Sequence, residues 1–126
     1  MSGQRFPRAA RLLRKAQFDA VFTAGLRQHT SLFRAHVALG TGAPARLGLA
    51  VAKRILPHAS ERNRVRRHAR EVFRRRRDAL FGVDVILVPK DSVRTARGTA
   101  VQDDLARLFD RLATLNRSPP PGTIAG

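Results

Sequence analysis

The chain has 126 residues, enough for a single domain with one modest core. Its 25 Lys and Arg residues outnumber 9 Asp and Glu residues, which gives a formal net charge of +16, and it contains no cysteine. Disulfides, thiolate nucleophiles and cysteine-based zinc sites are therefore excluded, and a reducing cytoplasm is the expected location. No run of 18 apolar residues is present, so we expect no membrane-spanning helix. Nucleic acid is the first partner that this charge suggests, and an anionic membrane surface is the second.

The first element that the sequence predicts is a short helix at 15–24. Helical spacing places Phe18, Val21 and Phe22 on one face of this segment. Gly25 follows directly and is a typical C-terminal stop for a helix.

Two strands are predicted next. In residues 33–39, apolar side chains at every second position alternate with Arg34, His36 and Ala38, as in a half-buried strand. The glycine-rich segment 40–45 indicates a turn, and residues 46–53 predict a second strand. On that second strand every other position, beginning with Gly48, is Gly or Ala, so one face of the sheet has room above it.

The second half of the chain predicts a long helix at 59–80, a buried strand at 83–88 and a final helix. The final helix has a continuous apolar stripe made of Val101, Leu105, Leu108, Phe109, Leu112 and Leu115. Thr99 and Gln102 are spaced as a capping box at its start. The strand, helix and strand in the middle form one β-α-β unit, which indicates a small α+β sandwich with helices packed on one sheet.

The segment 60–77 is the most informative part of the sequence, because its eighteen residues hold nine arginines and only two acids. Four apolar residues at helical spacing can pack on a core: Val65, Ala69, Val72 and Phe73. Arginines repeat every four residues along a neighbouring face, at Arg62, Arg66, Arg70 and Arg74. So many like charges repel one another, and their presence on a folded helix indicates a structured polyphosphate ligand. Coding bias explains part of the Arg to Lys ratio of 22 to 3, but it does not explain the clustering.

No catalytic or metal-binding motif is apparent. The chain has no GxxxxGK(S/T) loop, no GxGxxG and no HExxH. His68 and Glu71 stand three residues apart on the basic helix, but the surrounding arginines would oppose a metal ion, and a solvated helix face is the better interpretation. Asp103 and Asp104 are both expected on the solvated face of the last helix. The sequence therefore predicts a binding module without catalytic residues or metal ligands.

Two pairs of residues outside the basic helix are candidates for RNA contacts. Arg34 and His36 occupy positions of the strand at 33–39 that alternate with its core-facing residues, so they point away from the core. They either face solvent or contact single-stranded RNA, with His36 stacking on a base and Arg34 binding phosphate. Phe18 and Phe22 are either core residues or present an edge to bases beside that sheet. The residues alone leave both alternatives open.

Four blocks of sequence, in order, resemble the bacterial ribonuclease P protein subunit over residues 8–115. LGLAVAKR at 47–54, followed by ERNRVRRHARE at 61–71, is similar to the Lys/Arg pair and the Arg-Asn-Arg helix of that family. LLRKAQFDAVFTAG at 12–25 resembles its first helix, VDVILVPK at 83–90 the strand after the basic helix, and LARLF the last helix. The Arg-Asn-Arg motif alone is a weak signal, whereas the four blocks together are specific.

The resemblance implies a single-domain α+β sandwich similar to the second domain of ribosomal protein S5. It has one mostly four-stranded sheet and three helices in the order α-β-β-β-α-β-α. The crossover through the basic helix is expected to be left-handed, against the general right-handed rule. The domain would cover residues 11–116, between a flexible basic arm at 1–10 and a disordered Pro-rich tail at 117–126.

The resemblance also implies two RNA-binding surfaces. The family's catalytic RNA would contact Lys53, Arg54, Arg62, Asn63, Arg64, Arg66, Arg67 and Arg70. The 5′ leader of precursor tRNA would lie in a cleft lined by Phe18, Phe22, Arg34 and His36. In this family the RNA subunit carries out phosphodiester hydrolysis with its own Mg²⁺ ions, so no cofactor is expected on the protein.

Three alternatives to a ribonuclease P subunit share the same charge. A small basic ribosomal protein, or another structural RNA-binding protein without processing activity, is opposed by the four motif blocks. A DNA-binding protein has no use for a leader-binding Phe face, so DNA is not an expected partner. A membrane is not expected either, because the basic helix has only a narrow apolar face without the Trp and Leu of an interfacial anchor. An enzyme that acts alone is separated from the others by a cleavage assay on precursor tRNA with and without the catalytic RNA.

Overall fold

The computed structural model describes residues 10–12 and 14–117. Apart from their innermost residues, the arm predicted at 1–10 and the tail predicted at 117–126 lie outside the described residues. The elements follow one another as α1 Lys15–Ala24, β1 Leu26–His29, β2 Phe33–Ala38, β3 Arg46–Leu49, α2 Ala59–Arg76, η3 Asp78–Leu80, β4 Asp84–Pro89, η4 Asp91–Thr95 and α3 Gly98–Arg117. The order α-β-β-β-α-β-α is confirmed, with the two short 3-10 helices η3 and η4 in addition.

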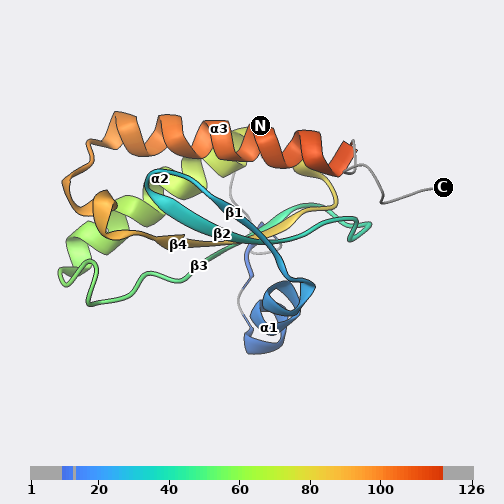
Figure 1. The fold of residues 1–126 in the computed structure, drawn as a ribbon, viewed down its shortest axis with the longest axis horizontal. Helices are drawn as coiled ribbons and strands as arrows, with labels where there is room; N and C mark the ends of the chain where they lie inside the picture. Colours follow the sequence, from blue (N-terminus) through green and yellow to red (C-terminus); the bar gives the residue numbers. More distant parts are fainter. Residues whose placement is uncertain (1–9, 13, 118–126) are drawn as a thin grey trace.

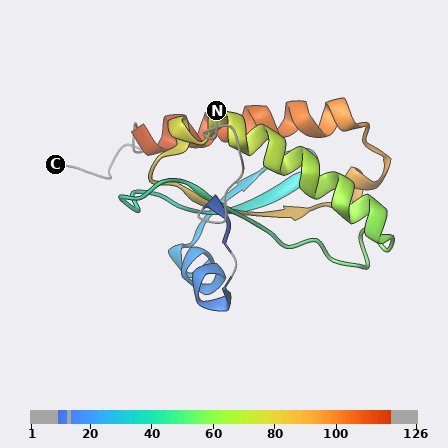
Figure 2. The ribbon, with the colours of Figure 1, turned by 180° about the vertical axis from the view of Figure 1, so that it is seen from behind.

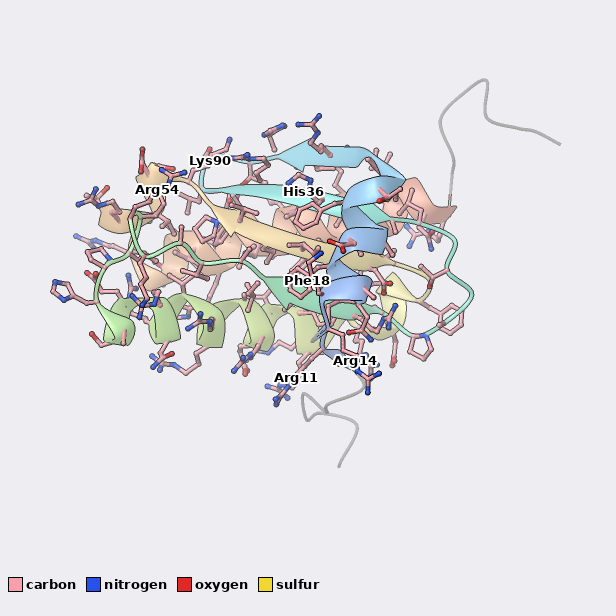
Figure 3. The ribbon with its side chains drawn as sticks, turned by 90° about the horizontal axis from the view of Figure 1, so that it is seen from below. Arg11, Arg14, Phe18, His36, Arg54 and Lys90 are labelled. Atoms are coloured by element: carbon pink, nitrogen blue, oxygen red, sulfur yellow. The ribbon has the colours of Figure 1, made fainter. Side chains whose placement is uncertain are left out.

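The four strands form one sheet in the order β1-β2-β4-β3 (Figure 1). β2 pairs antiparallel with both β1 and β4, whereas β3 and β4 are parallel neighbours joined through α2. In Figure 3, which looks onto the face opposite α2, both parallel strands run the same way and α2 lies behind them. Seen instead from the α2 side with the strands pointing up, β4 lies to the left of β3. The crossover is therefore left-handed, as predicted.

α2 and α3 lie side by side on one face of the sheet, and α1 crosses the other face (Figures 1 and 2). Alternation along β2 directs Phe33, Ala35 and Val37 toward the helix pair, where they are fully buried. The apolar faces predicted for both helices meet these residues. The rings of Phe73 on α2 and Phe109 on α3 pack edge to face, with their centroids 5.6 Å apart. Most of the core lies in this layer.

The opposite face of the sheet is covered at one end only (Figure 3). α1 ends at Gly25, whose φ of 81° lies in the left-handed region that glycine tolerates, as the sequence predicts. Beneath α1, the side chains of Leu12, Val21 and Ile86 form a second, small buried cluster. Because α1 is short, the rest of this face is left for side chains of the sheet itself.

The segment before α1 extends the sheet at its β3 edge. Arg11 forms an isolated parallel bridge with Leu47, and the Leu12 backbone N–H donates to the Leu47 carbonyl at 2.9 Å. These contacts fix the backbone of Arg11 beside β3.

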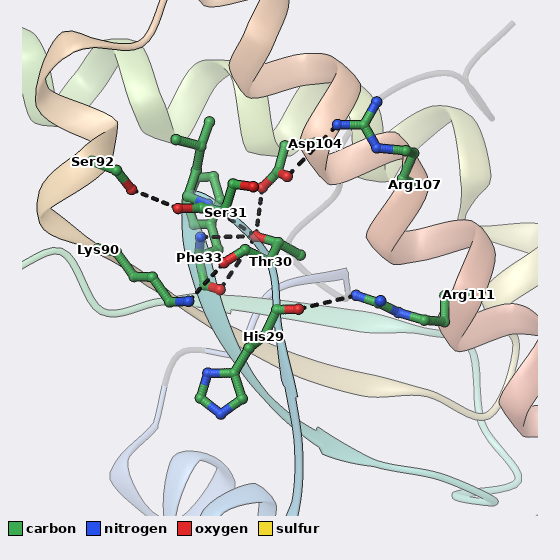
Figure 4. Close-up of polar contacts among 10 residues, drawn as sticks. His29, Thr30, Ser31, Phe33, Lys90, Ser92, Asp104, Arg107 and Arg111 are labelled. Carbon is green, nitrogen blue, oxygen red and sulfur yellow. Dashed lines mark hydrogen bonds and ion pairs between the residues drawn. The ribbon is translucent and has the colours of Figure 1, made fainter.

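The prediction that Asp104 faces solvent is wrong. Its side chain is buried, and Thr30 Oγ1 donates a hydrogen bond to Asp104 Oδ2 at 2.5 Å (Figure 4). The same hydroxyl oxygen accepts the backbone N–H of Phe33 at 2.9 Å. The β1–β2 turn is thereby tied to α3, whereas the neighbouring Asp103 is exposed, as predicted.

The capping box predicted for the last helix is also wrong. α3 begins at Gly98, so Thr99 lies inside its first turn. The side chain of Gln102 is used elsewhere, because its Nε2 lies 2.9 Å from Nδ1 of His68 on α2. Gln102 therefore links the two helices.

Two predicted elements are longer than those observed. β3 ends at Leu49, whereas the prediction extended to residue 53. α2 ends at Arg76 instead of residue 80, and the 3-10 helix η3 begins at Asp78. Among the described residues, no helix is long and apolar enough to cross a membrane.

Candidate nucleic-acid interface

Alternate side chains of β1 and β2 line the part of the sheet that α1 leaves open. The strand register places Arg27 opposite His36 and His29 opposite Arg34. Directly opposed residues point to the same face, so all four lie on the α1 side. A groove of about 450 Å³ runs over this face. Its charged lining consists of Arg27, Arg34, Arg54, Lys90 and Asp91.

Two of these cations reach the groove from outside β1 and β2. Arg54 lies in the loop after β3, and Figure 3 shows it close to Lys90 at the end of β4. Lys90 Nζ donates to the Thr30 carbonyl at 2.6 Å, which holds the ammonium group at the rim (Figure 4). The structure thus brings Arg54, predicted to contact the catalytic RNA, together with Arg34, predicted to contact the leader.

A row of rings lies between α1 and the sheet. Phe18 and Phe22 of α1 have centroids 6.5 Å apart, and Phe22 meets His36 edge to face at 4.7 Å. Phe22 is 42% exposed, whereas Phe18 is half-buried and packs on the cluster beneath α1. Burial, followed by the positive charges of neighbouring residues on β1 and β2, lowers the pKa of His36. At neutral pH the row therefore consists of three uncharged rings.

Arg62, the first arginine of the predicted stripe, is held by the protein itself. Its Nη1 donates hydrogen bonds to the backbone carbonyls of Leu56 and Pro57, each at 2.9 Å. These bonds fasten the loop before α2 to the helix, and this loop carries Lys53 and Arg54. Arg62 therefore positions the basic pair that the sequence predicts as an RNA contact.

The other predicted residues of α2 differ in exposure. Asn63 and Arg67 are exposed, while Arg64, Arg66 and Arg70 are half-buried. Arg66 Nη1 donates a long hydrogen bond to Asn63 Oδ1 at 3.3 Å. The first half of α2 thus presents a mixture of fully exposed and partly sheltered basic groups.

The positive charge of the last turns of α2 is partly neutralised within the protein. Arg74 and Arg75 both donate to Glu71 Oε2, at 2.5 and 2.9 Å. The hydrogen bond from Arg74 is the largest cause that lowers the pKa of Glu71. Arg76 pairs with Asp110 of α3 at 3.0 Å. Positive charge that can meet a ligand is therefore concentrated in the first two thirds of the helix.

The side chains of His68 and Glu71 have partners other than a metal ion. His68 bonds to Gln102, and Glu71 bonds to the arginines of its own helix. Within residues 10–12 and 14–117, no group of three His, Cys, Asp or Glu side chains could hold a metal ion.

Four basic residues that are not among the predicted contacts also lie beside these surfaces or beside α2: Arg11, Arg27, His29 and Lys90. Arg27 and His29 alternate along a strand, and that alternation could have revealed them. Arg11 joins the site only because its backbone bridges to Leu47, so no local pattern identifies it.

A family model for ribonuclease P matches residues 6–113, which is most of the chain. The chain belongs to the ribonuclease P protein family. The ribonuclease P protein component of Xanthomonas euvesicatoria pv. vesicatoria is 33% identical over 121 residues, which cover 96% of this chain and 83% of that protein. The ribonuclease P protein component of Thioalkalivibrio sulfidiphilus is 34% identical over 116 residues, covering 92% of this chain and 97% of that one.

Solved structures of ribonuclease P proteins share this fold. The Staphylococcus aureus protein superimposes with a TM-score of 0.75 at 21% identity, covering 86% of this chain and 99% of the other. The Thermotoga maritima protein gives a TM-score of 0.70 at 24% identity, with coverage of 80% and 96%. At these identities the likeness shows the fold, whereas the roles of individual side chains follow from the contacts in this chain.

Proposed function

We propose that this ribonuclease P protein is the RNA-binding subunit that assists a catalytic RNA in removing the 5′ leader of precursor tRNA. α2 and the loop before it bind the catalytic RNA, and the open sheet face binds the leader. The supporting observation is the open sheet face, which carries both a groove with four cations in its lining and a row of three rings. Cations bind the phosphates of single-stranded RNA, and aromatic rings stack on its bases.

The protein contributes binding and charge neutralisation in this proposal. Its arginines bind phosphates, release counterions and lower the repulsion between two polyanions, the catalytic RNA and its substrate. Phosphodiester hydrolysis belongs to the RNA subunit and the Mg²⁺ ions that it positions. The donor set of the protein agrees with this division, because four guanidinium and ammonium groups line the groove beside the single carboxylate of Asp91, and their net positive charge would repel a metal ion.

A cleavage assay on precursor tRNA at low Mg²⁺ concentration tests the role of the whole protein. The protein alone should release no leader, and its addition to the cognate catalytic RNA should accelerate cleavage. Cleavage by the protein alone would identify an enzyme that acts by itself. Equal rates with and without the protein would identify a structural RNA-binding protein.

Two exposed phenylalanines provide a matched pair for testing leader binding. Phe22 stands in the row of rings, whereas Phe81 is 53% exposed and lies at the end of η3, outside that row. Phe22→Ala should weaken holoenzyme binding of precursor tRNA by about 1–3 kcal/mol, the stacking energy of one base, and should leave mature tRNA binding unchanged. Phe81→Ala should change neither. An equal loss for precursor and mature tRNA in Phe22→Ala would contradict leader binding at this face.

A further inference from the structure

A second, smaller pocket lies where the segment before α1 meets α2. Its volume is about 140 Å³. Three arginines line it, Arg11, Arg66 and Arg70. Its apolar wall includes Phe18, the first ring of the row that leads to the groove, together with leucines of β3 and of the N-terminal segment.

The fold brings these three guanidinium groups together from two separate segments. Arg66 and Arg70 are four residues apart on α2, so they occupy one face of the helix in successive turns. Arg11 lines the same pocket because its backbone bridges to Leu47 at the sheet edge. The Leu12 backbone N–H then donates to Leu47 and fixes the direction of the chain.

This pocket concentrates positive charge in a partly sheltered place. All three arginines are half-buried, and no carboxylate is among the described residues that line the pocket. Burial, followed by the charges of Arg11 and Arg66, lowers the pKa of Arg70. Like charges that share one pocket raise one another's energy, and a bound anion would relieve that repulsion.

The size and wall of the pocket indicate the kind of anion. A volume of about 140 Å³ is well below the roughly 300–1,000 Å³ of sites that enclose whole small molecules, so it has room for a single anionic group. Guanidinium groups favour phosphate because their planar fork binds two oxygens at once. The Phe18 ring forms one wall, so a strand with its phosphate here would have neighbouring bases beside the ring row.

We propose that Arg11, Arg66 and Arg70 form a seat for one backbone phosphate of the precursor tRNA leader, where the strand passes from the ring row to α2. This seat rests on the proposed function, because it requires the leader to lie on the open sheet face. The seat gives Arg11 a binding role. It also assigns Arg66 and Arg70 to the substrate, whereas the resemblance in sequence predicts that they contact the catalytic RNA.

A methylphosphonate scan of the leader tests the seat. Each leader phosphodiester of a precursor tRNA is replaced in turn by a neutral methylphosphonate, and binding to the assembled holoenzyme is measured. The wild-type holoenzyme should lose roughly 10-fold in affinity at the seated position, the value of one charge-assisted hydrogen bond. Arg11→Gln should lose a similar factor with the unmodified leader, and the further loss at that one position should be smaller than in the wild type, because only Arg66 and Arg70 still contact the phosphate. Arg66→Gln repeats the measurement in case Arg11→Gln does not fold.

Arg117→Gln is the matched control, because it removes the same charge at the exposed end of α3, outside the pocket. It should leave the profile of the scan unchanged. If the wild type distinguishes precursor from mature tRNA but no leader position couples to Arg11 or Arg66, the seat is wrong and the proposed function stands. If the wild type makes no such distinction, both fail. A variant that weakens assembly with the catalytic RNA and leaves the scan unchanged would place that RNA's phosphate in the pocket and overturn the seat.

Discussion

Gly48 of β3 lies directly beneath the ring of Phe18. A Cβ atom at position 48 would lie 2.9 Å from Phe18 Cζ, closer than side chains approach one another, and 3.1 Å from Leu12 Cβ, which is a tight contact. The absence of a side chain on Gly48 therefore sets the depth at which α1 rests on the sheet, and with it the position of the ring row beside the groove.

Gly48→Ala should lower the free energy of unfolding by about 1–3 kcal/mol, the usual cost of overpacking. It should also weaken precursor tRNA binding relative to mature tRNA, because Phe18 must move. Urea unfolding and two binding titrations measure these effects. Phe18→Leu in the Gly48→Ala background should restore part of the stability. A Gly48→Ala protein as stable as the wild type would show that the ring moves aside without cost.

Asp104→Ala should destabilise the fold by about 1–3 kcal/mol, because the Thr30 hydroxyl loses its buried acceptor. The ion pair with Arg107, at 3.9 Å on the solvent side, adds little. Asp103→Ala, at the exposed neighbouring position, should change the unfolding free energy by no more than about 0.5 kcal/mol. Thermal or urea unfolding compares the two variants. Equal effects would mean that Asp104 behaves as a solvated residue.

Arg62→Gln and Arg67→Gln separate a positioning arginine from an exposed one. Arg62→Gln breaks two hydrogen bonds to the loop before α2, so it should lower stability by about 1–3 kcal/mol and also weaken RNA binding. Arg67→Gln should leave stability within about 0.5 kcal/mol of the wild type. It should make the salt dependence of catalytic RNA binding shallower by about one counterion. An unchanged salt slope in Arg67→Gln would remove Arg67 from the interface.

Stability should decline as the pH falls below about 6.5. Burial, followed by the charges of nearby arginines, lowers the pKa of both His36 and His68 from the ordinary value of 6.5. The unfolded chain therefore takes up these protons at a higher pH than the folded chain does. The contribution of these two histidines to the free energy of unfolding is therefore complete above pH 6.5. It is lost as the pH falls toward their pKa values in the folded chain.

His68→Gln should flatten this decline, because it removes one of the two histidines that resist protonation in the folded chain. Urea unfolding at several pH values between 5 and 8 measures the slope for the wild type and the variant. Stability of the wild type that rises on acidification within this window would contradict the direction of both pKa shifts.

Local periodicity predicts the helices and strands in which apolar residues recur at regular spacing along one buried face. α1, β2 and the apolar stripe of α3 are confirmed for this reason. β1 is not located by the residues, because LRQH has a single apolar side chain and the strand exists through its pairing with β2. β3 is shorter than predicted because the chain leaves β4 after Leu49, where only Ala50 still donates to Leu87, at 3.0 Å.

The chemistry of the site could be predicted, but the grouping of its residues could not. The arginines of α2 and the rings of α1 stand out in the sequence by composition and spacing. Arg54 joins Arg34 in the groove, and Arg11 joins Arg66 in the smaller pocket, because segments distant in the chain meet in the fold. The burial of Asp104 cannot be predicted for the same physical reason, since its partner Thr30 is 74 residues away.

β3 is an outer strand of the four-stranded sheet, and such an edge offers unpaired N–H and C=O groups on which another chain can add a strand. The bridge from Arg11 to Leu47 and the bond from Leu12 occupy part of that edge. A protein shortened to begin after Leu12 would leave the edge bare, and we expect it to self-associate, which light scattering would detect as oligomers that grow with concentration. The segment before α1 therefore also protects the protein against edge-to-edge aggregation.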